Sequence, residues 1–197
     1  GQNCMPLVLD THLMSHILRA QGIARRYLIT NGLDGALTIL GMLTGFYISG
    51  MTDISTAITA CLGATIALFI SGLSSAYLSE KAEREKELLE LEQALMRNLQ
   101  SSDYGQASRY LPIMIAIVNG FSPLILSLMI LSPLFLAEQI AFLSISPFMS
   151  SIVVALVCIF LLGVFLGKIS QTFWLWSGLR TLIIAIITIL IILLFSY

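Results

Sequence analysis

Asp34 is the residue of this chain with the clearest chemical potential, because it stands inside a long apolar stretch. It belongs to the segment 31–38, in which Gly32 and Gly35 flank it and Asn and Thr side chains offer oxygens one turn away on either side. A carboxylate within a membrane span is costly to bury, so it usually faces a bundle interior, an ion path or a partner. We therefore expect Asp34 to line a cation path. The alternative is that it caps a helix or neutralises a base such as Arg26.

Four glutamates form a second candidate site. Spacings of three, four and three residues place them on one face of a helix: Glu80, Glu83, Glu87 and Glu90. Hard divalent cations favour several carboxylate oxygens that converge on one point. Side chains of one helix fan along its axis, so a second helix or chain would have to complete such a site. The alternative, favoured by these residues taken alone, is a solvated helix with interleaved Lys and Arg.

Two weaker candidates lie in the first 50 residues. His12 and His16 are four residues apart and could hold a transition metal from one helix face, although the polar edge of an interfacial helix is the more common role. Gly41 and Gly45 form a ridge of small residues that permits close helix packing, including packing between two copies of the chain. The sequence contains no nucleotide-binding loop and no nucleophile elbow. We therefore expect no enzyme, no resident cofactor and no ATP-driven step.

The elements that must position these residues are apolar tracts. Hydrophobic residues make up 57% of the 197 residues and charged residues 11%, and the mean hydropathy is +0.94. A soluble domain is typically about 25% charged, so this composition excludes an ordinary soluble protein. A helix of about 20 apolar residues crosses the hydrocarbon layer, and the alternation typical of barrel strands is absent. The sequence predicts an all-α membrane protein with five transmembrane helices, at residues 27–50, 54–78, 110–136, 147–167 and 178–195.

The charge distribution predicts the orientation of these helices. The ten Lys and Arg residues precede the first expected span, separate the second from the third, or lie near the connection between the fourth and fifth. The two turns at the opposite ends carry Asp53 and Glu138 but no base. Short loops rich in Lys and Arg stay in the cytoplasm. We expect a cytoplasmic N-terminus and a C-terminus on the other side.

Four sections organise the chain along its length. They are an amphipathic helix in the cytoplasmic interface (residues 1–26), two transmembrane helices (27–79), a charged cytoplasmic extension of the second helix with a turn (80–109), and three further transmembrane helices (110–197).

Three groups of residues together resemble the vacuolar iron transporter family. They are Asn-Gly-Leu-Asp-Gly around Asp34, the end of the second span from Ser71 to Leu78 running into Glu, Lys and Arg, and Ser-Gly-Leu-Arg at 177–180. The resemblance, which covers most of residues 25–197, implies a homodimer that exports Fe²⁺, or sometimes Mn²⁺, from the cytosol in exchange for protons. It also implies an ion path between protomers lined by Asp34, and metal capture by Glu residues of the extended second helix.

The chain departs from that family at several places, one of them being Ala64 or its neighbours, where family members carry a Glu. Family members carry a Met where this chain has Gly72, and a three-helix cytosolic metal-binding unit where this chain has only residues 79–109. The resemblance is therefore to a divergent branch with a shortened cytosolic metal-binding region.

The sequence thus predicts a homodimeric divalent metal transporter. Its expected metal-binding residues are Asp34, Glu80, Glu83, Glu87 and Glu90. Its expected partners are the lipid bilayer, divalent metal ions, protons and a second copy of the chain, with no nucleic acid. It would lie in the cell membrane of a prokaryote or in a vacuolar-type membrane of a eukaryote. The alternative hypothesis is a non-transporting membrane scaffold whose charged helix binds a protein partner.

Overall fold

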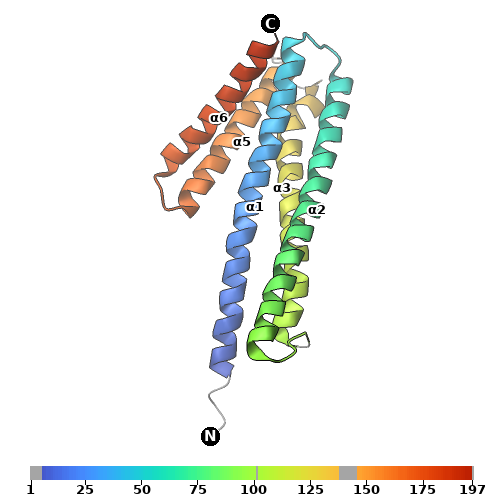
Figure 1. Ribbon diagram of the computed structural model, residues 1–197. Coiled ribbons are helices and arrows are strands. Elements are labelled where there is room, and N and C mark those ends of the chain that lie inside the picture. Colours follow the sequence, from blue (N-terminus) through green and yellow to red (C-terminus); the bar gives the residue numbers. More distant parts are fainter. Residues whose placement is uncertain (1–5, 101, 138–145, 197) are drawn as a thin grey trace.

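The residues that the structure describes form five α-helices and no strands. The computed structural model describes residues 6–100, 102–137 and 146–196, with the backbone alone for residues 6–21 and 103. The helices are α1 (Pro6–Ile48), α2 (Ile54–Leu95), α3 (Asp103–Phe135), α5 (Pro147–Ile169) and α6 (Trp174–Phe195) (Figure 1).

Four of these helices, α2, α3, α5 and α6, are long and apolar enough to cross a membrane. The prediction of an all-helical fold is confirmed for the described residues, and the four apolar helices are compatible with a multi-pass membrane protein. Large apolar side chains are exposed along α5 and α6, for example Val157, Leu161, Ile187 and Leu190. Such continuous exposed apolar surface suits lipid rather than water.

The helix α1 has one face buried against the rest of the bundle. It contacts each of the other four helices, and its residues Ala36, Ile39, Leu40 and Leu43 are fully buried. The opposite face, which carries Thr30, Asp34 and Thr38, is exposed, so α1 is buried on one side only. Whether α1 crosses the membrane as a fifth span stays a prediction.

The helix α1 is also longer than the first expected span. It runs without interruption through position 26, where the sequence suggests a boundary between an interfacial helix and the first span. No proline follows Pro6 in this range, and Gly22 alone does not break the helix. The segments 1–26 and 27–50 therefore meet within one continuous helix of 43 residues, about 64 Å long at 1.5 Å per residue.

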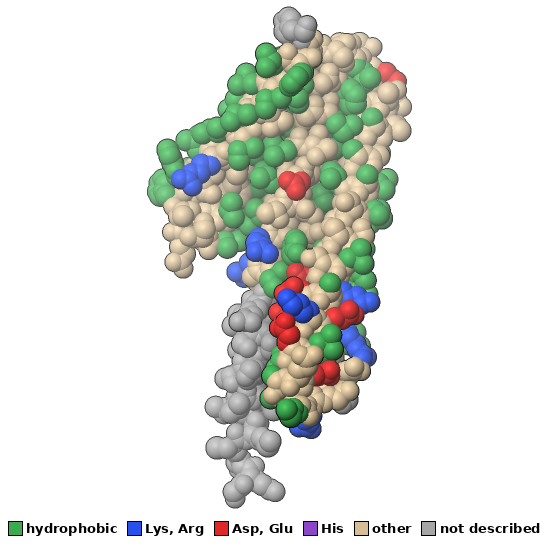
Figure 2. Space-filling view, in the orientation of Figure 1, with side chains coloured by type: hydrophobic (Ala, Val, Ile, Leu, Met, Phe, Trp, Pro, Cys, Tyr) green, Lys and Arg blue, Asp and Glu red, His purple; other side chains and the backbone are tan. Residues whose placement is uncertain are grey.

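The bundle has two levels. All five helices lie together in one part, whereas α1, α2 and α3 continue well beyond the short turn that joins α5 to α6 (Figure 1). The 23 residues of α5 span about 35 Å, close to the thickness of a bilayer core. On the face drawn in Figure 2, no Lys or Arg lies at the end that carries the C-terminus and the α1–α2 turn. The charge segregation read from the sequence is therefore also visible on this face of the structure.

Asp53, the acidic residue of the α1–α2 turn, is the N-cap of α2. Its carboxylate accepts hydrogen bonds from the backbone N–H of Ser55 at 3.1 Å and from the hydroxyl of Thr56. The bond from Thr56 is the main cause that lowers the pKa of Asp53 below its usual value. Asp53 therefore fixes the start of α2.

Candidate functional site

Asp34 lies on the surface of α1, far from both ends of the helix. Its side chain is exposed, as are those of Thr30 and Thr38, one turn away on either side. The two Thr hydroxyls donate to backbone carbonyls, that of Thr30 to Arg26 at 2.9 Å and that of Thr38 to Asp34 itself at 2.7 Å. Neither hydroxyl donates to the carboxylate. Because Asp34 lies within the helix and not at either end, its side chain does not cap α1.

Arg26, the base that the sequence suggested as a partner, forms no ion pair with Asp34 either. The guanidinium of Arg26 lies over the ring of Tyr27, with its carbon 5.9 Å from the ring centroid. Across the part of the chain that the structure describes, every ion pair lies on α2. The Asp34 carboxylate is thus available to an external partner.

Asp34 is part of a longer stripe of polar and small residues along α1, here called the α1 stripe. Its members recur at spacings of three or four residues: Thr30, Asp34, Thr38, Gly41 and Gly45. A side chain added at Gly45 would meet no other atom within 4 Å, and one added at Gly41 would meet only Ile192, at 3.5 Å. The described part of the chain therefore leaves this stripe largely uncovered.

The glutamate run on α2 is divided by Arg84. Its guanidinium lies 2.6 Å from a carboxylate oxygen of Glu87 and 3.5 Å from one of Glu80, and Glu80 is buried, with 7% of its surface exposed. Glu90 pairs loosely with Lys86 at 3.9 Å, while Glu83 is exposed. Glu80 and Glu87 therefore lie on one face of α2, as their spacing predicts, but both carboxylates pair with the guanidinium of Arg84 between them.

A metal site within one chain is not formed by these carboxylates. No group of three or more His, Cys, Asp or Glu residues among those with described positions could hold a metal ion. Asp34 stands on α1, and the four glutamates stand on the extended part of α2. The side chains of His12 and His16 lie outside the described residues.

A buried polar junction between α1, α2 and α3 is a feature that the sequence did not reveal as a unit. Asn119 of α3, only 2% exposed, donates its side-chain N–H to the backbone carbonyl of Gly72 on α2 at 2.6 Å. Asn31 of α1 donates to the backbone carbonyl of Asn119 at 3.4 Å. The hydroxyl of Ser122 donates to the backbone carbonyl of Leu28. The junction thus ties the three long helices together within their apolar region.

Two further residues, Pro123 and Gly72, allow the hydrogen bonds of this junction to form. Pro123 has no N–H, so the carbonyl four residues earlier, that of Asn119, lacks its helical partner and is free to accept from Asn31. Gly72 leaves space for both amides, because a Cβ there would lie 2.9 Å from the side-chain nitrogen of Asn31 and 3.3 Å from the carbonyl oxygen of Asn119. The signals in the sequence were the prolines of α3 and the Asn residues within apolar tracts. Their pairing with Gly72 depends on how the helices cross.

Replacing Asn119 by Leu is expected to destabilise the protein by about 1–2 kcal/mol, because the carbonyl of Gly72 then loses its donor in an apolar surrounding. Thermal unfolding of the purified protein in detergent measures this loss. Ser127→Ala is the matched control, since Ser127 is fully buried on the same helix and its hydroxyl has no hydrogen-bond partner within the described structure. Equal stability of the two variants would contradict a structural role for the junction.

Comparison with known proteins shows similarity to an archaeal protein. The chain is 33% identical over 159 residues to the uncharacterized protein MJ0645 of Methanocaldococcus jannaschii, and the alignment covers 79% of each chain. No family model matches the sequence. No solved structure matches it.

Proposed function

The chain belongs to the same family as this archaeal protein. We propose that it is a homodimeric transporter that exports a divalent metal cation, Fe²⁺ or Mn²⁺, from the cytosol in exchange for protons. The observation that carries this proposal is the position of Asp34. Its carboxylate is exposed on α1, two turns after Tyr27 at the start of the expected first span, and has no ion pair with any base that the structure describes. The resemblance to vacuolar iron transporters supports the choice of metal and of exchanged ion.

A second copy of the chain is the natural cover for the α1 stripe. A carboxylate that faces lipid costs about 2.5–3.5 kcal/mol on insertion scales, so an uncovered Asp34 is unfavourable. Two α1 stripes packed across a twofold axis would remove both carboxylates from lipid, and Gly41 and Gly45 would let the two helices approach closely. This arrangement also brings two Asp34 side chains together.

Two adjacent carboxylates would account for the proposed coupling to protons. Like charges at short range repel each other, so such a pair favours a bound cation, either a proton or a metal ion. A divalent cation would neutralise both carboxylates and take the place of a proton. Metal and proton therefore compete for one site, which is what an exchange of metal for protons requires.

The glutamates of α2 would serve as a cation-attracting surface at the cytoplasmic mouth. Glu83 and Glu90 are exposed, and Glu87 is partly exposed, so they raise the local cation concentration without a closed metal cage. Glu80 would have to leave Arg84 to bind metal. In this topology α1 is a fifth, central span, and the N-terminus and the extended part of α2 lie in the cytosol.

A non-transporting scaffold is the second candidate function, and one observation favours it. Arg84 already pairs with both Glu80 and Glu87, as a charged helix that only stabilises itself or presents a surface to a protein partner would do.

A flux assay with a pH readout separates the two functions. The full-length protein is reconstituted into liposomes that contain a pH-sensitive dye, and Fe²⁺, Mn²⁺, Zn²⁺ or Co²⁺ is added outside. The transporter predicts saturable metal uptake together with proton movement in the opposite direction. A scaffold predicts metal and proton fluxes no larger than those of liposomes without protein, and that result would refute the proposed transport.

A further inference from the structure

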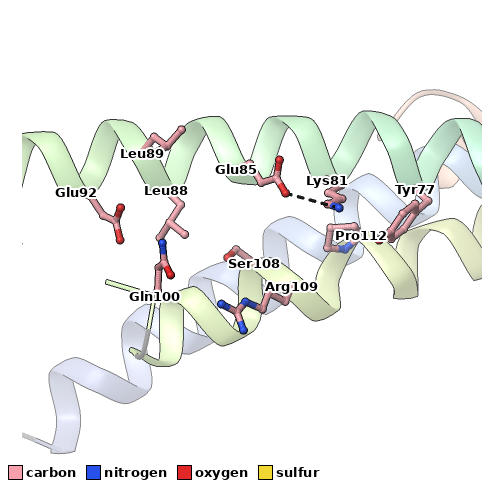
Figure 3. A pocket seen from close by; sticks show the side chains of 10 residues that line it. All are labelled: Tyr77, Lys81, Glu85, Leu88, Leu89, Glu92, Gln100, Ser108, Arg109 and Pro112. Carbon is pink, nitrogen blue, oxygen red and sulfur yellow. Dashed lines mark ion pairs between the residues drawn. The ribbon is translucent and has the colours of Figure 1, made fainter. Parts of the chain in front are cut away.

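A cavity of about 540 Å³ lies between α2 and α3, away from Asp34 and from the α1 stripe. Tyr77 and Lys81 line it from α2, and Arg109 and Pro112 line it from α3 (Figure 3). Lys81 is about half exposed, and Arg109 is exposed. The cavity is therefore open to the surroundings of the protein.

The two basic side chains of this cavity come from different helices but lie at the same level. The helices α2 and α3 run antiparallel, and their close approach at Gly72 and Asn119 fixes their register. Following that register toward the charged end of α2 brings Lys81 level with Arg109, and both line the same cavity. Two positive charges thus flank one space.

The acidic side chains of the cavity neutralise these charges only weakly. Glu85 lies 3.8 Å from the amine of Lys81, and both side chains are largely solvated, at 66% and 49% exposed; such a surface pair contributes little. Glu92 accepts the backbone N–H of Leu99 at 2.8 Å, so its carboxylate closes the turn after α2. Arg109 takes part in none of the ion pairs that the described residues form.

The position of the cavity relative to the apolar region points to its ligand. Tyr77 stands where the apolar tract of α2 gives way to its charged part, and the amine of Lys81 lies 5.8 Å from the centroid of the Tyr77 ring. Tyr110, beside Arg109, is 66% exposed. Tyrosines gather at the headgroup level of membranes, so this end of the cavity lies where lipid phosphates lie.

We propose that the cavity binds the phosphate of an anionic phospholipid, with Lys81 and Arg109 as its ligands. Arginine offers a planar fork of donors that matches phosphate, and lysine adds a compact charge. Basic pockets between membrane helices are suited to anionic headgroups. Tyr77 and Pro112 provide the apolar wall beside the glycerol and the first acyl carbons. This site requires that the protein lie in a bilayer but does not require that it transport metal.

Titration of the purified protein in detergent with phosphatidylglycerol, followed by native mass spectrometry, tests this site. Removing either charge, in Lys81→Gln or Arg109→Gln, is expected to weaken lipid binding about fivefold, and removing both on the order of 25-fold. Arg109→Lys keeps the charge and should retain most of the affinity. The matched control is the double variant Lys86→Gln, Arg97→Gln, which removes two nearby charges outside the cavity and should change binding less than twofold.

Three outcomes would overturn the proposal. One is an equal loss of affinity in the control variant, which indicates only general surface charge. Another is equal binding of zwitterionic phosphatidylcholine. The third is equal binding of free glycerol phosphate, which identifies a soluble phosphate ester as the ligand. Thermal unfolding of each variant verifies the fold, and the single variants decide the matter if the double variant does not fold.

Discussion

Asp34→Asn is expected to reduce metal uptake into proteoliposomes to the rate of liposomes without protein. Asn has nearly the same size as Asp and still offers a carbonyl oxygen, but it carries no negative charge. A divalent cation that has left water needs that charge, because the attraction between opposite charges is strong where the dielectric constant is low. The exchange of protons should disappear together with the metal flux, since the same carboxylate carries both.

Stability should move in the opposite direction in this variant. Removing a charge from an apolar region lowers the cost of insertion, so Asp34→Asn should unfold at the same temperature as the parent protein or higher. Asp53→Asn is the matched control: it makes the same chemical change in the exposed α1–α2 turn, where Asn can still cap α2, and it should transport normally. Undiminished flux in Asp34→Asn would remove Asp34 from the ion path.

Gly163→Ala is expected to destabilise the protein by about 3 kcal/mol. A Cβ at this position would lie 2.1 Å from the hydroxyl oxygen of Thr181 and 2.8 Å from the Cα of Gly178. The helices α5 and α6 would have to separate. The hydroxyl of Thr181 would then lose its bond to the carbonyl of Ile159, now 3.1 Å long.

Thermal unfolding in detergent measures this effect against a glycine of the same secondary structure. Gly63 lies within α2, and a Cβ there would meet no atom within 4 Å. Gly63→Ala should therefore be neutral or stabilise the protein by up to about 1 kcal/mol through helix propensity. Adding Thr181→Ala to Gly163→Ala should restore part of the loss only, because the Gly178 backbone remains in the way. Similar unfolding temperatures for Gly63→Ala and Gly163→Ala would show that the α5–α6 contact is looser than described.

The course of the helices was largely readable from the sequence. Hydropathy and length are local properties, so the ends of α5 and α6 and the start of α2 agree with the predicted ranges to within a few residues, whereas α3 begins at Asp103, seven residues before its predicted span. The continuation of α2 as far as Leu95 followed from helix-forming residues without Gly or Pro. The continuity of α1 could not be read from the sequence, because a change of polarity such as that near Arg26 does not by itself show whether a helix ends or continues.

The contacts of the candidate site were only partly readable. Helical spacing predicted that Glu80 and Glu87 share a face of α2, and the same spacing of three and four residues places Arg84 on that face between them. The exposure of Asp34 could not be read, because it depends on which face of α1 the other helices cover. The meeting of Asn31, Gly72 and Asn119 likewise depends on crossing angles, which no single segment encodes.

The unbroken course of α1 has a mechanical consequence. Because no hinge separates its outer half from Asp34, a sideways push on the protruding end would tilt the whole rod and shift the carboxylate. The other four described helices all contact α1, so α1 would tilt about the region where they hold it. A displacement of the protruding end can in this way reach Asp34 without any helix unwinding.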